Sequence, residues 1–114
     1  EFLERCRRFI GVESTPTTGN VEVAQLAAQW CREIGLNVTL HEGVIAGVGQ
    51  ANVIARPIEQ RPEQEILFQT HLDTTSPGTY SLWTETDRNP FNATIHGDRI
   101  YGLGAVNSLS LIHI

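Results

Sequence analysis

The chain has 114 residues, of which 40% are hydrophobic and 18% charged, and its formal net charge is −5. This composition is typical of a single soluble globular domain. The basic residues are all arginines and form no basic patch, and no apolar run approaches the roughly 18 residues of a membrane helix, so we expect neither nucleic acid nor a membrane as a partner.

The first third of the chain predicts two helices joined by a polar loop. Apolar residues at helical spacing predict a helix over residues 1–12. Residues 14–19 contain Pro16 and Gly19 and predict a loop. A second helix is expected to begin with Asn20 as its N-cap and to end at Ile34, where Gly35 suits a left-handed C-terminal cap. Its predicted buried stripe consists of Val23, Leu26, Ala27, Trp30, Cys31 and Ile34.

The two cysteines, Cys6 and Cys31, fall on the apolar sides of these two helices. Their spacing matches neither a metal knuckle nor a redox pair. We therefore interpret both as reduced core residues, which favours a cytoplasmic location.

The rest of the chain predicts strands. Residues 36–41 alternate apolar and polar residues, residues 43–49 are rich in glycine and predict a flexible connection, and residues 51–56 predict a second strand. The contiguous apolar residues of 65–71 predict a strand that is covered on both faces. Residues 93–96 and 99–101 predict a hairpin with Gly97 and Asp98 as its turn. The expected fold class is α/β, with helices flanking a mixed sheet.

His71 and Asp73 are the candidate site residues, because they come at the carboxyl end of the most buried predicted strand, where ligands collect in open α/β sheets. A neutral imidazole is a common zinc ligand, and such a ligand usually donates its other ring N–H to a carboxylate or a carbonyl. Asp73 could supply that carboxylate. Taken alone, His-x-Asp also fits the polar end of an ordinary strand.

A series of further motifs follows Asp73 in a fixed order. They are Thr74-Thr75-Ser76-Pro77-Gly78, Leu82-Trp83, Asn89-Pro90-Phe91 and the run from Ile95 to Ala105. Together with the helices and the loop at the front of the chain, this series resembles a family of dinuclear zinc hydrolases. The family includes acetylornithine deacetylase, succinyl-diaminopimelate desuccinylase, aminoacylase and the glutamate-releasing carboxypeptidases such as carboxypeptidase G. The resemblance spans nearly all of residues 1–108.

The resemblance implies that residues 1–108 are the amino-terminal part of a three-layer αβα metallohydrolase catalytic domain. His71 would be a metal ligand, and Asp73 would orient and polarise it in a catalytic role. The implied cofactor is a pair of zinc ions, or of cobalt ions, whose shared water attacks an amide carbonyl. The implied substrates are N-acyl amino acids or small peptides, and a homodimer is compatible with the resemblance. The general-base glutamate and the other metal ligands of the family come later in its sequences.

Two departures from the family pattern keep other interpretations open. Asn107 occupies the position of the metal-bridging aspartate, and a neutral amide bridges two cations less well than a carboxylate does. Residues 109–114 can be read as a translated sequencing-adapter end, so we expect them to be a non-native tail. The alternatives are a catalytically inert fragment, a relative that binds ligands without turnover, and a purely structural α/β interaction module.

The remaining histidines and aromatic residues have ordinary structural interpretations. His41 ends a strand on its polar side and is expected at the surface. His96 is interpreted as structural, and His113 lies in the suspect tail. Trp83 and Phe91 are expected to be packing residues.

Overall fold

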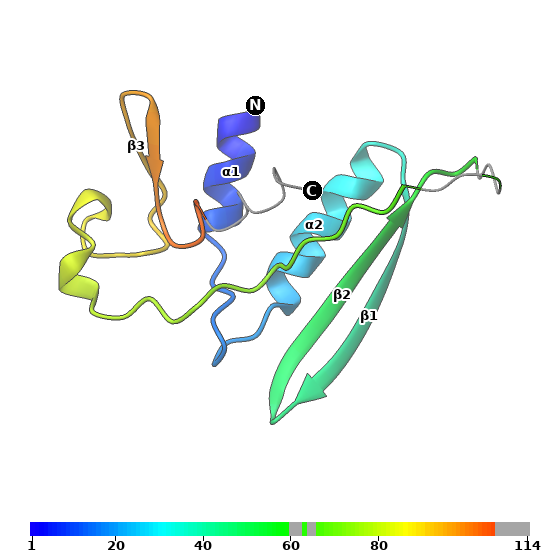
Figure 1. Ribbon diagram of the computed structural model, residues 1–114, viewed down its shortest axis with the longest axis horizontal. Helices are drawn as coiled ribbons and strands as arrows, with labels where there is room; N and C mark the ends of the chain where they lie inside the picture. The colour runs from blue at the N-terminus through cyan, green and yellow to red at the C-terminus, as the bar shows by residue number, and fades with distance from the viewer. Residues whose placement is uncertain (60–62, 64–65, 107–114) are drawn as a thin grey trace.

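The computed structural model describes residues 1–59, 63 and 66–106. Two helices are followed by a long hairpin, an irregular segment with two short 3₁₀ helices, and a short hairpin (Figure 1). The elements are α1 (Phe2–Ile10), α2 (Val21–Glu33), β1 (Asn37–Ile45), β2 (Val48–Arg56), η1 (Tyr80–Leu82), η2 (Thr84–Thr86), β3 (Thr94–His96) and β4 (Arg99–Tyr101).

Both helices lie where the sequence predicts them. Helix α2 ends as expected, because Gly35 has a φ of +84°, which places it in the left-handed region. The Gly35 and Leu36 amides donate to the carbonyls of Arg32 and Cys31, so carbonyls of the last turn are satisfied. Cys6 and Cys31 are free thiols and are half-buried.

Asn20 directly precedes α2, but its side chain does not cap the helix. Its Oδ1 accepts a hydrogen bond from the Ala51 amide at 2.7 Å, and its Nδ2 donates to the Ala51 carbonyl at 3.1 Å. Both groups are buried, so satisfying them together is worth more than an exposed cap. The prediction of an N-cap was right about the position and wrong about the interaction. The side chain joins the start of α2 to the middle of β2.

The buried face of α2 is made of smaller residues than the sequence predicted. Val23, Ala24 and Ala28 are buried against the hairpin, together with Ala51 of β2. Trp30 is half-buried, because it packs on α1 instead: its ring lies 5.6 Å from that of Phe9, and the guanidinium groups of Arg5 and Arg8 lie over it. Ile34, predicted to belong to the stripe, is 69% exposed.

The first hairpin is longer than predicted, and residues 43–49 are not a flexible loop. β1 and β2 pair in antiparallel register from Asn37 opposite Arg56 to Ile45 opposite Val48. Only Ala46 and Gly47 form the turn, with φ values of +50° and +81°. Two successive positive φ angles match the twist of a tight two-residue hairpin turn. Gly43 therefore lies within β1 and Gly49 within β2.

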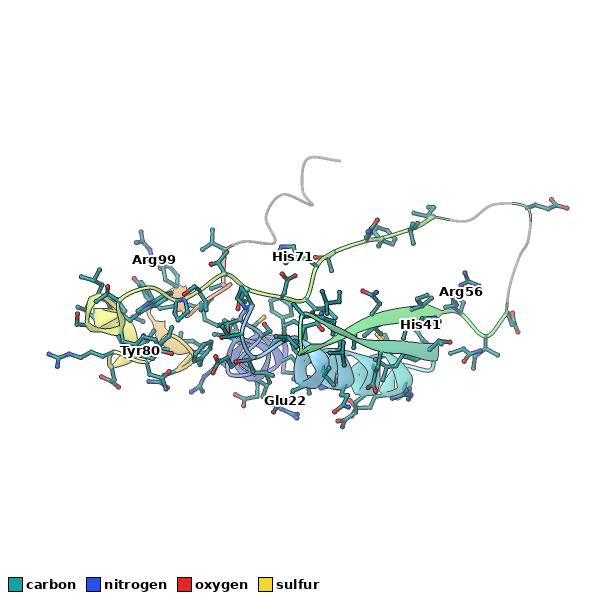
Figure 2. The ribbon with its side chains drawn as sticks, turned by 90° about the horizontal axis from the view of Figure 1, so that it is seen from below. Glu22, His41, Arg56, His71, Tyr80 and Arg99 are labelled. Carbon is teal, nitrogen blue, oxygen red and sulfur yellow. The ribbon has the colours of Figure 1, made fainter. Side chains whose placement is uncertain are left out.

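The described residues contain two separate antiparallel sheets in place of one mixed sheet: β1 pairs with β2, and β3 with β4. The short hairpin and its turn lie where the sequence predicted them. Figure 2 shows α2 against one side of the long hairpin, with His71 on the other side. The described residues thus combine helices and strands as the sequence predicted, and α2 covers one face of the long hairpin.

The prediction of a buried strand over residues 65–71 was wrong for its described part. Residues 66–71 form neither helix nor strand, and the side chains of Ile66, Leu67 and Phe68 are 84%, 85% and 91% exposed. A strand needs a neighbour for its backbone hydrogen bonds, and no described strand pairs with this segment. Residues 64 and 65 lie outside the described part.

Gly19 and Gly35 offer a matched test of the packing between α2 and the long hairpin. Both have φ values near +80°, but a Cβ at Gly19 would collide with the Gly49 carbonyl oxygen, whereas one at Gly35 meets nothing within 4 Å. We expect Gly35→Ala to lower the free energy of unfolding by roughly 1–2 kcal/mol, the cost of the left-handed backbone. Gly19→Ala should lose about 1–3 kcal/mol more from overpacking. Urea denaturation measures both, and equal losses would contradict this packing.

Candidate functional site

The segment that carries the candidate site residues is attached to the folded part of the chain at few points. The Thr74 amide donates to the Ser14 carbonyl at 2.9 Å, and Ser14 is only 2% exposed. Further along, the indole Nε1 of Trp83 donates to the Pro77 carbonyl at 2.9 Å. These two hydrogen bonds position the stretch that immediately follows Asp73.

His71 and Asp73 lie in direct contact. The His71 Nδ1 is 2.8 Å from the Asp73 carbonyl oxygen and 3.4 Å from its carboxylate Oδ1. A carbonyl oxygen can only accept, so Nδ1 is the donor in this contact, and a neutral imidazole in this arrangement has its lone pair on Nε2. That is the tautomer in which an imidazole binds a metal ion through Nε2. The side chains of His71 and Asp73 are 49% and 61% exposed, so both are accessible from solvent.

The donor set of the described residues fits part of a metal centre. His71 offers one nitrogen ligand, and Asp73 lies next to it. Within residues 1–59, 63 and 66–106, no group of three or more His, Cys, Asp or Glu side chains is placed to hold a metal ion. Asn107, which the resemblance predicts at the metal-bridging position, and the tail predicted to be non-native lie outside the described residues.

A pocket of about 680 Å³ is lined by residues of two sequence motifs, the one that follows Asp73 and the one that ends the described chain. It is lined on one side by Thr74 and Thr75, which follow Asp73, and on another by Gly102, Gly104, Ala105 and Val106, which precede Asn107 in the sequence. The two motifs approach closely, because a Cβ on Gly104 would lie 3.0 Å from the Thr74 Cγ2. Gly104 also has a φ of +84°, which favours glycine. The chain on either side of the pocket therefore leads directly to the two predicted metal-site positions.

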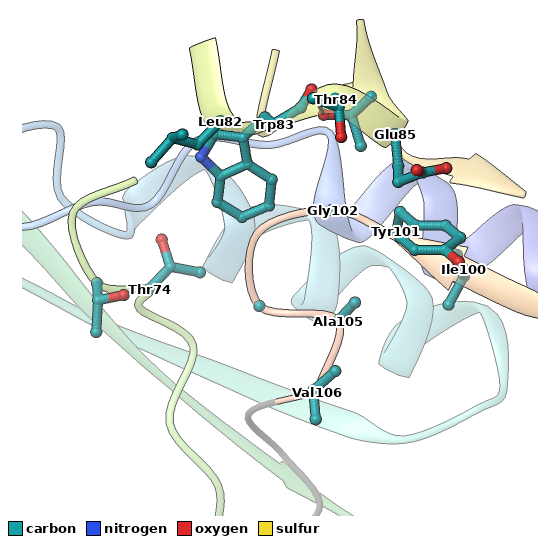
Figure 3. A pocket seen from close by; sticks show the side chains of 13 residues that line it. Thr74, Leu82, Trp83, Thr84, Glu85, Ile100, Tyr101, Gly102, Ala105 and Val106 are labelled. Carbon is teal, nitrogen blue, oxygen red and sulfur yellow. Dashed lines mark hydrogen bonds between the residues drawn. The ribbon is translucent and has the colours of Figure 1, made fainter. Parts of the chain in front are cut away.

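Glu85 and His96 form a polar pair beside this pocket that the sequence did not reveal. The His96 Nδ1 lies 2.9 Å from the Glu85 Oε2, and the His96 ring lies 5.7 Å from that of Tyr101 (Figure 3 shows Glu85 and Tyr101). The two residues of the pair are eleven positions apart, and no local pattern predicts that the hairpin brings them together. His41, in contrast, is exposed on β1, as predicted.

No helix in the described part of the chain is both long enough and apolar enough to cross a membrane. Comparison with known proteins found no matching family model and no matching solved structure.

Curated proteins named acetylornithine deacetylase are similar to the chain in sequence. It is 30% identical over 113 residues, or 94% of its length, to the acetylornithine deacetylase of Aliivibrio salmonicida (strain LFI1238) and to that of Aliivibrio fischeri (strain MJ11). The protein of that name from Vibrio atlanticus (strain LGP32) is 30% identical over 112 residues. The chain spans 28% of the length of the two Aliivibrio proteins and 27% of the Vibrio protein.

The buried hydroxyl group of Thr74 allows a test of the packing around this site. Its Oγ1 is inaccessible to solvent and has no hydrogen-bond partner among the described residues. An unpaired buried hydroxyl costs about 1–3 kcal/mol, so Thr74→Val, which keeps the shape of the side chain, should leave the free energy of unfolding unchanged or raise it.

Thr15→Val is the control for this measurement. Thr15 is 4% exposed, and its hydroxyl donates to the Glu13 carboxylate at 3.0 Å. Removing that hydrogen bond should destabilise the chain by about 1–3 kcal/mol. Urea denaturation compares the two variants. A Thr74→Val loss as large as that of Thr15→Val would mean that the Thr74 hydroxyl is paired.

Proposed function

We propose that the chain is the amino-terminal part of a metal-dependent hydrolase that cleaves the amide bond of N-acyl amino acids or small peptides. The observation that carries the proposal is the close approach of Thr74, directly after the His71–Asp73 pair, to Gly104, shortly before Asn107. The similarity of 94% of the chain to acetylornithine deacetylases supports the same class of reaction. A deacetylase of this type is the leading candidate, with a desuccinylase as its nearest alternative.

In this proposal His71 binds a metal ion through Nε2. Asp73 holds the proton on Nδ1 through its carbonyl oxygen at 2.8 Å, with its carboxylate at 3.4 Å adding electrostatic polarisation. A bound pair of zinc or cobalt ions supplies a water molecule of lowered pKa as the nucleophile. The residues of this chain orient one ligand of that pair and shape the adjoining pocket.

The proposal places these residues in a three-layer αβα catalytic domain. Residues 66–71, exposed in the described structure, would become a strand covered by further secondary structure in that domain, which explains their contiguous apolar side chains. A cytoplasmic location, inferred from the two free cysteines, and a homodimeric state, compatible with the family resemblance, remain part of the proposal.

His71 and Asp73 can be tested in the complete gene product, assayed for hydrolysis of N-acetylornithine with added zinc. Replacing His71 by Ala removes a metal ligand, so we expect activity to be lost together with zinc content. Asp73→Asn removes the carboxylate that polarises His71 and should reduce kcat/KM by roughly 10–100-fold.

His41→Ala is the matched control for these two variants, since His41 is an exposed histidine on β1. It should leave both hydrolysis and zinc content unchanged. Zinc content and hydrolysis that survive in the His71→Ala variant would contradict the proposed role of His71.

Asn107→Asp tests whether the catalytic proposal or the inert alternative describes the complete protein. A carboxylate at this position would bridge two cations better than the amide does. If the natural protein is inactive and Asn107→Asp restores hydrolysis, the chain comes from an enzyme damaged at this position. If the natural protein already hydrolyses the substrate, the inert alternative is wrong.

A further inference from the structure

The face of the long hairpin that turns away from α2 is hollowed. Over residues 37–41 and 51–56, side chains alternate between an inner face and an exposed face. Figure 2 shows Arg56 on the side of the hairpin opposite α2. A groove of about 320 Å³ lies on the exposed face, and it is lined by Asn37, Thr39 and His41 of β1 and by Ile54 and Arg56 of β2.

The antiparallel register brings these side chains together. Asn37 lies opposite Arg56, and Thr39 lies opposite Ile54. Residues that are directly opposite on one face of an antiparallel pair have Cβ atoms about 4.5–5.5 Å apart. An amide group, a hydroxyl group and a guanidinium group are therefore neighbours around the Ile54 side chain, which is 42% exposed and offers an apolar surface.

The groove carries a permanent positive charge and no negative charge. Arg56 is always protonated, and none of the five lining residues is Asp or Glu, although the chain contains 13 acidic residues. His41 adds a second positive charge when it is protonated. Among the described residues, Arg56 takes part in no ion pair. Its guanidinium group is therefore available to an anionic ligand.

We propose that this groove binds a small carboxylate with a short apolar stem. The planar guanidinium fork of Arg56 can donate two parallel hydrogen bonds to one carboxylate. The Thr39 hydroxyl and the Asn37 amide group supply further donors beside it. The stem would cover the exposed part of Ile54, and removing apolar surface from water favours binding.

The volume of the groove sets the size of the ligand. Small-molecule sites in proteins span about 300–1,000 Å³, so a groove of about 320 Å³ suits a ligand of a few carbon atoms. The groove shares no residue with the pocket beside Thr74 and contains neither His71 nor Asp73. The carboxylate site therefore goes beyond the proposed hydrolysis and does not depend on it.

Binding of butyrate to the 114-residue chain tests this proposal. Butyramide has nearly the same shape without the charge, and inorganic phosphate has negative charge without the stem. The backbone amide signals of Thr39 and Ile54 in a ¹⁵N-labelled sample follow each titration, since these residues face each other across the two strands. We expect butyrate to shift both signals at a lower concentration than either of the other two probes.

Arg56→Gln removes the charge and keeps a polar side chain, so it should weaken butyrate binding by roughly 10- to 100-fold. Arg56→Lys keeps the charge but loses the paired donors, and it should weaken binding by roughly three- to tenfold. Arg32→Gln is the matched control: it removes the same charge from an exposed position on α2 and should leave butyrate binding unchanged. None of the three should alter the binding of butyramide.

Equal affinities for butyrate and butyramide would overturn the proposal, and so would an Arg56→Gln variant that binds butyrate as well as the natural chain does. Signals of Thr39 and Ile54 that butyrate leaves unmoved would also overturn it. An equal loss in Arg32→Gln and Arg56→Gln would mean that overall charge attracts the anion, against a defined groove. Phosphate binding as tight as that of butyrate would refute the apolar contact with Ile54. The spectra of the variants report whether each one remains folded.

Discussion

The loop between α1 and α2, in which Ser14, Thr15 and Asn20 are buried, links the long hairpin and the segment after His71 to the helices. The Ser14 carbonyl receives the Thr74 amide, and the Asn20 side chain exchanges two hydrogen bonds with Ala51. The Glu13 carboxylate accepts hydrogen bonds from the hydroxyls of Thr15 and Thr18, which adds contacts within the loop itself. One short stretch thereby joins the start of α2 to β2 and holds the segment that follows His71 through Thr74.

The sequence predicted correctly those elements that depend on residues close together in the chain. The two helices and the Gly97–Asp98 hairpin follow from periodicity and turn residues within a few positions. The prediction of a flexible loop over residues 43–49 was wrong. It relied on the high glycine content, whereas the turn needs only Ala46 and Gly47, and the residues on either side remain paired. The strand expected over residues 65–71 failed for a different reason: its formation depends on partner strands, which no local pattern supplies.

In the candidate site, too, contacts between residues close in sequence could be predicted, whereas contacts between distant residues could not. His71 and Asp73 are two positions apart, so their contact could be anticipated from spacing and from the resemblance to a zinc hydrolase family. The pairing of Glu85 with His96, and the reciprocal bonding of Asn20 with Ala51, each join residues on different elements. The sequence predicted a structural role for His96, and no pattern in it pointed to Glu85. Only the folded arrangement shows that the two stand beside a pocket next to the motif residues.

The exposed run Ile66-Leu67-Phe68 also has a consequence for how long the chain survives intact. Endopeptidases bind their substrates as an unpaired stretch of backbone, and three large apolar side chains more than 80% exposed are good occupants for specificity pockets. A cut after Phe68 would separate the long hairpin and both helices from His71 and everything that follows it. Among the described residues, the segment that leads to the candidate metal ligand is therefore also an accessible site for proteolysis.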